Sequence, residues 1–302
     1  MKNAREVFFL IGANGRVLYR DTDESPLALP DRRARWEAIW QHRAELTELC
    51  HSHPIGPEAF SHEDVTTMQA LDAALGRRLP FSLVTPKGYF TRGARDEVVA
   101  SPRPPWFEEL LVASRALSPD ATLRFHLARW LAATPVRPVV ELEPLITALR
   151  DTRDVVFVCT HNSRRSQLAE AVARAIGQHM GLPHRFFSAG TEATAFATPA
   201  REALERAGFD PGALSQHSSK VLGDPSLPKS DFTAVMVCSD ADEACPFVKG
   251  ARHRVRLPFV DPKRSDSQPA AEQARVYDAS LDEIARDLAA ALRANGNSSA
   301  GP

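Results

Sequence analysis

Cys159 begins the sequence pattern C-x5-R-S, which Arg165 and Ser166 complete. The cysteine follows Val155–Val158, an all-apolar run typical of a buried parallel strand. We expect a helix to begin six or seven residues later, so that loop N–H groups and the helix dipole can hold an oxyanion. Such a loop makes a cysteine a nucleophile, Arg165 offers a bidentate guanidinium, and Ser166 can hydrogen-bond the thiolate. The remaining residues expected around the oxyanion are Thr160, His161, Asn162, Ser163 and Arg164.

A second group of residues has the chemistry of a metal site. His51 and His53 are two positions apart on an expected strand, so their side chains point to the same face. Asp64, in the first turn of the next expected helix, can supply a third ligand. Two imidazoles and a carboxylate suit Zn²⁺, and three protein ligands leave a position for water, as in catalytic sites. The alternative is that Ser61-x-x-Asp64 is only a capping box at a helix start.

The spacing of these residues resembles the signature of the JAMM (MPN/JAB) metalloproteases, because the seven residues Pro54–Phe60 separate His53 from Ser61. The resemblance covers about residues 5–95. It implies that His51, His53 and Asp64 bind zinc and that Ser61 hydrogen-bonds the oxyanion of the reaction.

The same resemblance implies a glutamate upstream as general base. Glu6 fits that place best and Glu24 is the fallback, whereas Cys50 is interpreted as a small core residue. The implied substrate is a peptide or isopeptide, or the tail of a small ubiquitin-like or sulfur-carrier protein, and the sequence does not identify it.

The C-terminal part of the chain, about residues 153–295, resembles the low-molecular-weight tyrosine phosphatases and, more narrowly, the thioredoxin-coupled arsenate reductases built on that fold. The resemblance rests on the Cys159 loop, on Ser188-Ala189-Gly190 after a strand, and on Asp261-Pro262. It implies that Asp261 is the general acid. The alternative for Asp261 is an ordinary Asp-Pro turn.

Two further cysteines favour the reductases within this family. Cys238 and Cys245 are seven residues apart after an expected strand, as in the reductases. The resemblance implies that Cys159 attacks arsenate, Cys238 attacks Cys159 and releases arsenite, and Cys245 attacks Cys238. Thioredoxin or another thiol reductant then reduces the Cys238–Cys245 disulfide. A helix over this segment would place the two Cα atoms about 10 Å apart, whereas a disulfide needs less than about 7 Å, so oxidation would require unwinding.

Two other interpretations remain open. One is a phosphatase that needs only Cys159, and it is favoured by His161 and Arg164, which replace the Gly and Cys of the best-known reductases. Lys263-Arg264 argues against it, because the phosphatases commonly carry tyrosines after Asp-Pro. The other is a binding module in which the loop senses phosphate or arsenate and gates the peptidase.

Composition narrows the class of protein. The 302 residues suggest two domains, and 43% hydrophobic with 25% charged residues exclude a disordered chain. Because 37 basic and 38 acidic residues nearly cancel, we expect no nucleic-acid partner. No apolar run approaches 18 residues, so we expect no membrane span. Four cysteines in so long a chain indicate a reducing compartment and a cytoplasmic enzyme.

The fold class predicted from these elements is α/β, with a JAMM-type α/β domain followed by a parallel-sheet, low-molecular-weight phosphatase-like domain. The expected domains are residues 1–100, a helical bridge over 101–150, residues 151–295, and a flexible tail over 296–302. Expected strands are Val7–Ile11, Arg16–Arg20, Leu46–His51, Phe81–Thr85, Val155–Val158, Phe186–Ser188 and 233–238. Expected helices are Asp31–His42, Ser61–Leu75, 119–133, Glu141–Arg150, Arg165–Met180, 198–207 and Ala271–Arg293.

Overall fold

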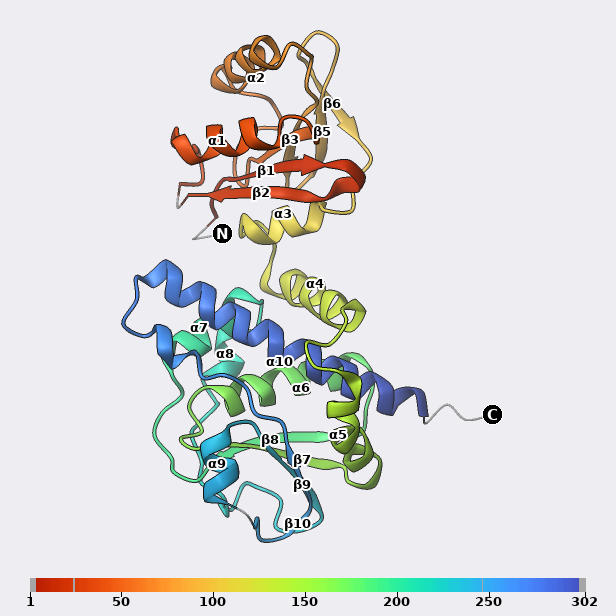
Figure 1. Ribbon diagram of the computed structural model, residues 1–302, viewed down its shortest axis with the longest axis vertical. Helices are drawn as coiled ribbons and strands as arrows, with labels where there is room; N and C mark the ends of the chain where they lie inside the picture. The colour runs from red at the N-terminus through yellow and green to blue at the C-terminus, as the bar shows by residue number, and fades with distance from the viewer. Residues whose placement is uncertain (1–3, 24, 246, 299–302) are drawn as a thin grey trace. The chain divides into compact units, whose positions relative to one another are not determined.

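The computed structural model describes residues 4–23, 25–245 and 247–298 (Figure 1). The chain divides into two compact units, one ending at Ser118 and the other beginning at Pro119. Two units agree with the number expected from the length of the chain.

The N-terminal unit contains a six-stranded mixed sheet in the order β2-β1-β3-β4-β5-β6. β3 and β4 are parallel, and the other neighbours are antiparallel. The first hairpin and the next two strands occur where the sequence predicts them, whereas β5 and β6 were not predicted because neither contains more than three consecutive apolar residues. The strands are β1 (Val7–Gly12), β2 (Val17–Thr22), β3 (Leu46–Ser52), β4 (Phe81–Thr85), β5 (Gly88–Arg92) and β6 (Val98–Ser101).

Helices cover both faces of this sheet. Successive residues of β1 alternate between two cores, since Leu10 packs with residues of α1 (Arg33–His42) and α2 (His62–Leu75), while Phe9 packs with α3 (Phe107–Ala113). α2 begins after Ser61 and ends at Gly76, which adopts the left-handed conformation expected of a C-terminal cap. The metal-binding residues predicted on β3 therefore lie on the face that α2 covers.

The expected helical bridge over residues 101–150 is not a separate unit. Its apolar residues belong to two different cores. Trp106, Phe107 and Leu110 pack in the N-terminal core, whereas Trp130 of α4 (Pro119–Ala132) and Leu142 of α5 (Val139–Asp151) pack in the C-terminal core. The boundary falls just before Pro119, the first residue of a helix and a position that proline favours.

The C-terminal unit contains a four-stranded parallel sheet in the order β10-β9-β7-β8. All residues of β7 (Asp154–Cys159) and β9 (Phe232–Met236) are buried, so both faces of the sheet are covered, as the apolar run 155–158 predicts. β8 (Arg185–Gly190) flanks β7 on the other side. β10 (Ala251–Arg256) was not predicted, because its basic residues interrupt any apolar run.

The helices of this unit place the candidate site at one end of the sheet. α6 (Arg165–His179) packs on β7 and β8, and α10 (Ala270–Ser298) packs along α5 and α6.

Residues 296–298, which were expected to be a tail, extend α10, and residues 299–302 lie outside the described residues. No helix in the described ranges is long and apolar enough to cross a membrane. The shorter helices are η1 (Ala13–Gly15), α7 (Thr198–Arg206), α8 (Pro211–Leu214), α9 (Ser239–Ala244) and η2 (Pro262–Ser265).

Candidate active sites

The loop between β7 and α6 is organised by one buried asparagine. Asn162 has a left-handed φ of 45°, and its side chain is fully buried. Its Nδ2 donates to Ser166 Oγ at 2.9 Å, and its Oδ1 accepts from the Lys220 backbone N–H at 2.7 Å. Both polar atoms of the side chain are therefore hydrogen-bonded to protein groups. Only the backbone N–H of Asn162 remains for the oxyanion contact that the sequence predicts.

Gly190 is required where β8 ends beside this loop. A Cβ atom at this position would lie 2.1 Å from Glu192 O and 2.8 Å from Asn162 N. Both are backbone atoms, so any larger residue would displace the loop. The close approach explains the glycine of the Ser188-Ala189-Gly190 run.

Cys159 and Ser166 lie together, as the C-x5-R-S pattern predicts. Cys159 is the last residue of β7 and is buried, and its Sγ lies 3.0 Å from Ser166 Oγ. Because Ser166 Oγ accepts from Asn162, its own proton remains available to the Cys159 sulfur. The serine can thus stabilise a thiolate.

Arg165 and Asp261 form an ion pair beside the loop. The Nη2 atom of Arg165 lies 2.8 Å from Asp261 Oδ2, and its Nη1 donates to Phe259 O at 3.1 Å. The buried Nε of Arg165 has no hydrogen-bond partner among the described residues. An anion oxygen would satisfy that N–H. Asp261 also accepts from the Lys263 backbone N–H. The same carboxylate therefore stabilises the Asp-Pro turn and contacts Arg165 of the Cys159 loop.

The other loop residues lie around the Cys159 site in different ways. The His161 side chain is half-exposed, and its Nε2 lies 3.6 Å from Glu192. The Ser163 carbonyl accepts from the Ala197 N–H. Arg164 lies 3.0 Å from Asp261 Oδ1, a contact that the sequence did not predict.

Cys238 lies beside the same loop because β9 is the parallel neighbour of β7. Its Sγ is 3.5 Å from Thr160 Oγ1 and accepts from the Ala241 N–H at 3.3 Å, as the N-cap of α9. Cys245 is the C-cap of α9 and is partly exposed. The segment between them is helical, so it would have to unwind before the two cysteines could form a disulfide. All four cysteines, each within the described ranges, are free thiols.

Two elements of this site were not predicted from the sequence. Residues 218–220 brace the loop, because the Ser219 hydroxyl donates to His161 O at 2.9 Å and the Lys220 N–H donates to Asn162. Arg254 of β10 holds α9 through Nε to Cys245 O at 3.0 Å and Nη2 to Asp242 O at 2.6 Å. Neither set has a local sequence pattern, since each contact joins separate elements.

We expect Asn162→Ala to slow alkylation of Cys159 by iodoacetamide tenfold or more and to abolish protection by phosphate. The variant removes hydrogen bonds worth about 1 kcal/mol each. It also places alanine at a positive φ, a conformation that asparagine tolerates better. Asn14→Ala is the matched control, because Asn14 has a φ of 58° in an exposed turn of the other unit. Unchanged alkylation and protection in Asn162→Ala would show that this side chain does not order the loop.

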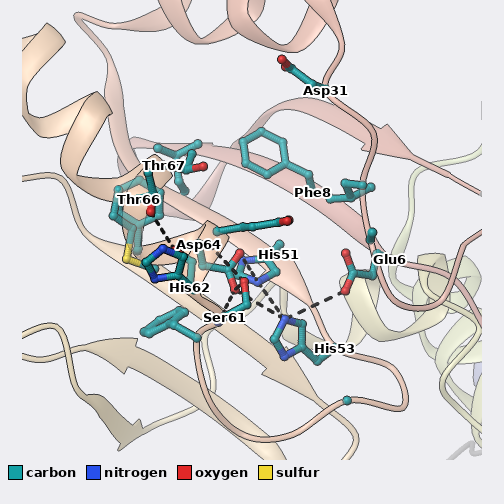
Figure 2. Close-up of a pocket in the computed structure, with 18 of the residues that line it drawn as sticks. Glu6, Phe8, Asp31, His51, His53, Ser61, His62, Asp64, Thr66 and Thr67 are labelled. Carbon is teal, nitrogen blue, oxygen red and sulfur yellow. Dashed lines mark hydrogen bonds and ion pairs between the residues drawn. The ribbon is translucent and has the colours of Figure 1, made fainter.

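The N-terminal unit brings His51, His53 and Asp64 together, as predicted (Figure 2). One ligand atom from each lies within 4.8 Å of the others. The two histidine Nε2 atoms are 3.1 Å apart, and His51 Nε2 is 3.3 Å from Asp64 Oδ1. The histidines come from β3 and its end, and Asp64 comes from the first turn of α2.

The hydrogen bonds of this cluster fit a zinc site. His53 Nδ1 lies 2.9 Å from Pro57 O, and because a carbonyl only accepts, Nδ1 must carry the proton. Burial and the charge of His51 lower the pKa of His53, so its Nε2 presents a lone pair to the cluster. An outer partner that fixes the tautomer is typical of a metal-binding histidine.

Asp64 is both part of a capping box and a candidate metal ligand, the two roles that the sequence left open. Ser61 and Asp64 form a capping box in which Asp64 Oδ2 accepts from the backbone N–H and hydroxyl of Ser61. Oδ1 faces His51. Burial alone would raise the pKa of Asp64, but the hydrogen bond and charge of His51 and the bonds from Ser61 hold it well below its usual range. Asp64 is therefore an ionised ligand candidate held by the cap.

Glu6 lies beside the cluster and immediately precedes β1. Its Oε1 is 4.0 Å from His53 Nε2, and the side chain is buried. Burial raises the pKa of Glu6 to about 7, against the lowering effect of His51. Glu24, the fallback, lies outside the described residues. Cys50 packs in the core on the opposite face of the sheet, as expected.

A cavity of about 760 Å³ opens over the cluster (Figure 2). Glu6, His51, His53, Ser61 and Asp64 line it, together with apolar residues that include Leu29 and Phe60. A substrate molecule in this cavity could therefore reach the predicted metal ligands.

A cysteine and an arginine in a C-x5-R loop at the end of a parallel strand, with an aspartate opposite, define a class of enzymes that form covalent adducts with oxyanions. Residues 154–295 match the family described as low molecular weight phosphotyrosine protein phosphatase. The chain belongs to this family, through its C-terminal unit, and is an enzyme of the phosphatase and arsenate reductase type.

Curated relatives and solved structures show similarity over this unit. Arsenate reductase 2 of Staphylococcus epidermidis is 34% identical over 128 residues, which are 42% of this chain and 90% of that protein. The arsenate reductase of Brevibacillus brevis is 35% identical over 114 residues, 38% of this chain and 80% of that protein. A low molecular weight protein tyrosine phosphatase from T. tengcongensis is 22% identical, with a TM-score of 0.40 over 47% of this chain and 99% of its own.

Proposed function

We propose that the C-terminal unit reduces arsenate to arsenite with a thiol reductant of the thioredoxin type. The observation that carries the proposal is the position of Cys238, whose sulfur lies 3.5 Å from Thr160 of the Cys159 loop. A phosphatase has no use for a second thiol there. Cys245 at the other end of α9 supplies the third thiol, and similarity to curated arsenate reductases adds support.

In the proposed reaction, the Cys159 thiolate attacks arsenic and an oxygen leaves as water after Asp261 supplies its proton. Cys238 then attacks the Cys159 sulfur. The sulfur–arsenic bond breaks, its electron pair stays on arsenic, and As(V) leaves as As(III) in arsenite. Cys245 next attacks Cys238, which frees the Cys159 thiolate and forms a Cys238–Cys245 disulfide. A dithiol reductant returns this disulfide to two thiols.

Product analysis tests this function. The full chain is incubated with arsenate, thioredoxin, thioredoxin reductase and NADPH, and arsenite is measured beside NADPH oxidation. We expect one arsenite for each NADPH and no turnover when thioredoxin is omitted. Hydrolysis of p-nitrophenyl phosphate without arsenite formation would favour the phosphatase interpretation instead.

We expect Arg254→Ala to accelerate formation of the Cys238–Cys245 disulfide about fivefold or more. Arg254 holds α9 in its helical form, and each hydrogen bond lost is worth about 1 kcal/mol. Quenched-flow alkylation after one turnover measures the rate. Arg252→Ala is the matched control, because Arg252 lies on the same strand but pairs with Asp231 rather than with α9. An unchanged or slower rate in Arg254→Ala would mean that unwinding of α9 does not limit this step.

We further propose that the N-terminal unit is a zinc-dependent peptidase of the JAMM type. The observation that favours it is the convergence of three ligand atoms, with a fixed His53 tautomer, in the lining of a cavity. Zinc held by His51, His53 and Asp64 would activate water for attack on a peptide or isopeptide bond. Glu6 would take up the proton of that water, and the cavity would hold the substrate segment.

A further inference from the structure

The two oxygens of the Asp261 carboxylate have different partners. Oδ1 is held by Arg164 Nε at 3.0 Å and by the Lys263 backbone N–H at 3.0 Å. Oδ2 is held by Arg165 Nη2 at 2.8 Å. Arg164 and Arg165 are adjacent at the start of α6, so the carboxylate lies between two guanidinium groups.

Arg165 keeps donors for an oxyanion while it holds Asp261. Its Nη1 donates to Phe259 O, and its Nε has no partner among the described residues. Because each Nη carries two N–H groups, Nη2 can donate one to Asp261 Oδ2 while Nε and the other Nη2 hydrogen remain for an anion. The Oδ2 atom of Asp261 therefore lies beside the guanidinium that would bind the anion.

Arg164 holds the other oxygen of the same carboxylate. Its side chain is only 14% exposed, so it is fixed against the protein. Its bond goes to Oδ1, the oxygen that Arg165 does not use. Because Arg164 and the Lys263 N–H both hold Oδ1, Oδ2 is the oxygen placed beside Arg165.

We propose that Arg164 is a positioning residue that holds Asp261 through Oδ1, so that Oδ2 is the oxygen that donates the proton to the leaving oxygen. The proton passes from Oδ2 to that oxygen, which leaves as water from arsenate or as an alcohol from a phosphate ester. Asp261 is left ionised. The inference rests on the proposed function for the acid step, but the same step occurs in ester hydrolysis.

A double-mutant cycle tests the inference on the full chain, with arsenate plus thioredoxin and, separately, with p-nitrophenyl phosphate. We expect Arg164→Met to lower kcat about tenfold to a hundredfold and to change KM less than threefold, because general acid catalysis contributes about 10²–10⁴-fold. Asp261→Asn should lower kcat at least as much. The double variant should be no slower than Asp261→Asn, because Arg164 acts only through Asp261.

Two controls separate this role from a structural one. Arg164→Gln can still donate one N–H to Oδ1 and should recover most of the lost kcat. Iodoacetamide labelling of Cys159, with protection by phosphate, should be unchanged in Arg164→Met if the loop is intact. Multiplicative effects in the double variant, or a raised KM with unchanged kcat, would overturn the inference and make Arg164 an anion-binding residue. If only the ester is turned over, the proposed arsenate reduction fails while the cycle on the ester still decides the role of Arg164.

Discussion

Cys159→Ser is expected to reduce arsenate turnover by roughly three orders of magnitude or more, because it removes the nucleophile itself. The other two cysteines should fail at later steps. Cys238→Ser should stop after the adduct on Cys159 forms, since no thiol then lies beside the Thr160 loop. Cys245→Ser should release one arsenite for each chain and then retain a Cys159–Cys238 disulfide. Rapid-quench measurement of arsenite per chain distinguishes these three outcomes.

This ordered series separates a reductase from a phosphatase, in which only Cys159 matters. Cys50→Ala is the matched control, because Cys50 is buried in the core of the N-terminal unit and has no place in the relay. It should retain full arsenate turnover. Equal activity of Cys238→Ser and the parent chain would contradict the relay.

The second large effect concerns metal content. We expect the purified chain to contain about one zinc ion, and His53→Ala to contain almost none, because the variant loses one of three ligands. Glu6→Gln should keep the metal, since Glu6 is placed to move a proton rather than to bind zinc. His62→Ala is the matched control, because His62 lines the same cavity but is not in the ligand cluster. Elemental analysis after dialysis measures all four proteins.

Zinc should also stabilise the N-terminal unit. A ligand that binds only the folded state at about a hundred times its Kd adds about 2.7 kcal/mol. A chelator should therefore lower the melting temperature of the parent chain and leave that of His53→Ala unchanged. Full zinc content in a His51→Ala/His53→Ala double variant would refute the site.

The sequence predicted those parts of the two sites that follow from short-range geometry. His51 and His53 share a face because strand residues alternate, and Ser61 and Asp64 form a cap because they are three residues apart at a helix start. The capping and metal-binding interpretations of Asp64 were not exclusive. Oδ2 of Asp64 accepts from Ser61 while Oδ1 faces His51, an arrangement that only the three-dimensional structure reveals.

The parts that escaped prediction depend on contacts between distant residues. Arg164 meets Asp261 across 97 positions, and Lys220 meets Asn162 across 58. The division at Ser118 was missed for the same reason, because the helices on either side of it pack into different cores. Strand β10 was missed because Arg252, Arg254 and Arg256 interrupt its apolar pattern.

The most direct test of the proposed reductase is disulfide mapping after a single turnover. The reduced chain is mixed with one equivalent of arsenate without thioredoxin, quenched with acid, alkylated and analysed by peptide mass spectrometry. We predict a Cys238–Cys245 disulfide, an alkylated Cys159 and one arsenite for each chain. If Cys238 and Cys245 are both alkylated as free thiols and no arsenite is formed, the thiol relay is wrong.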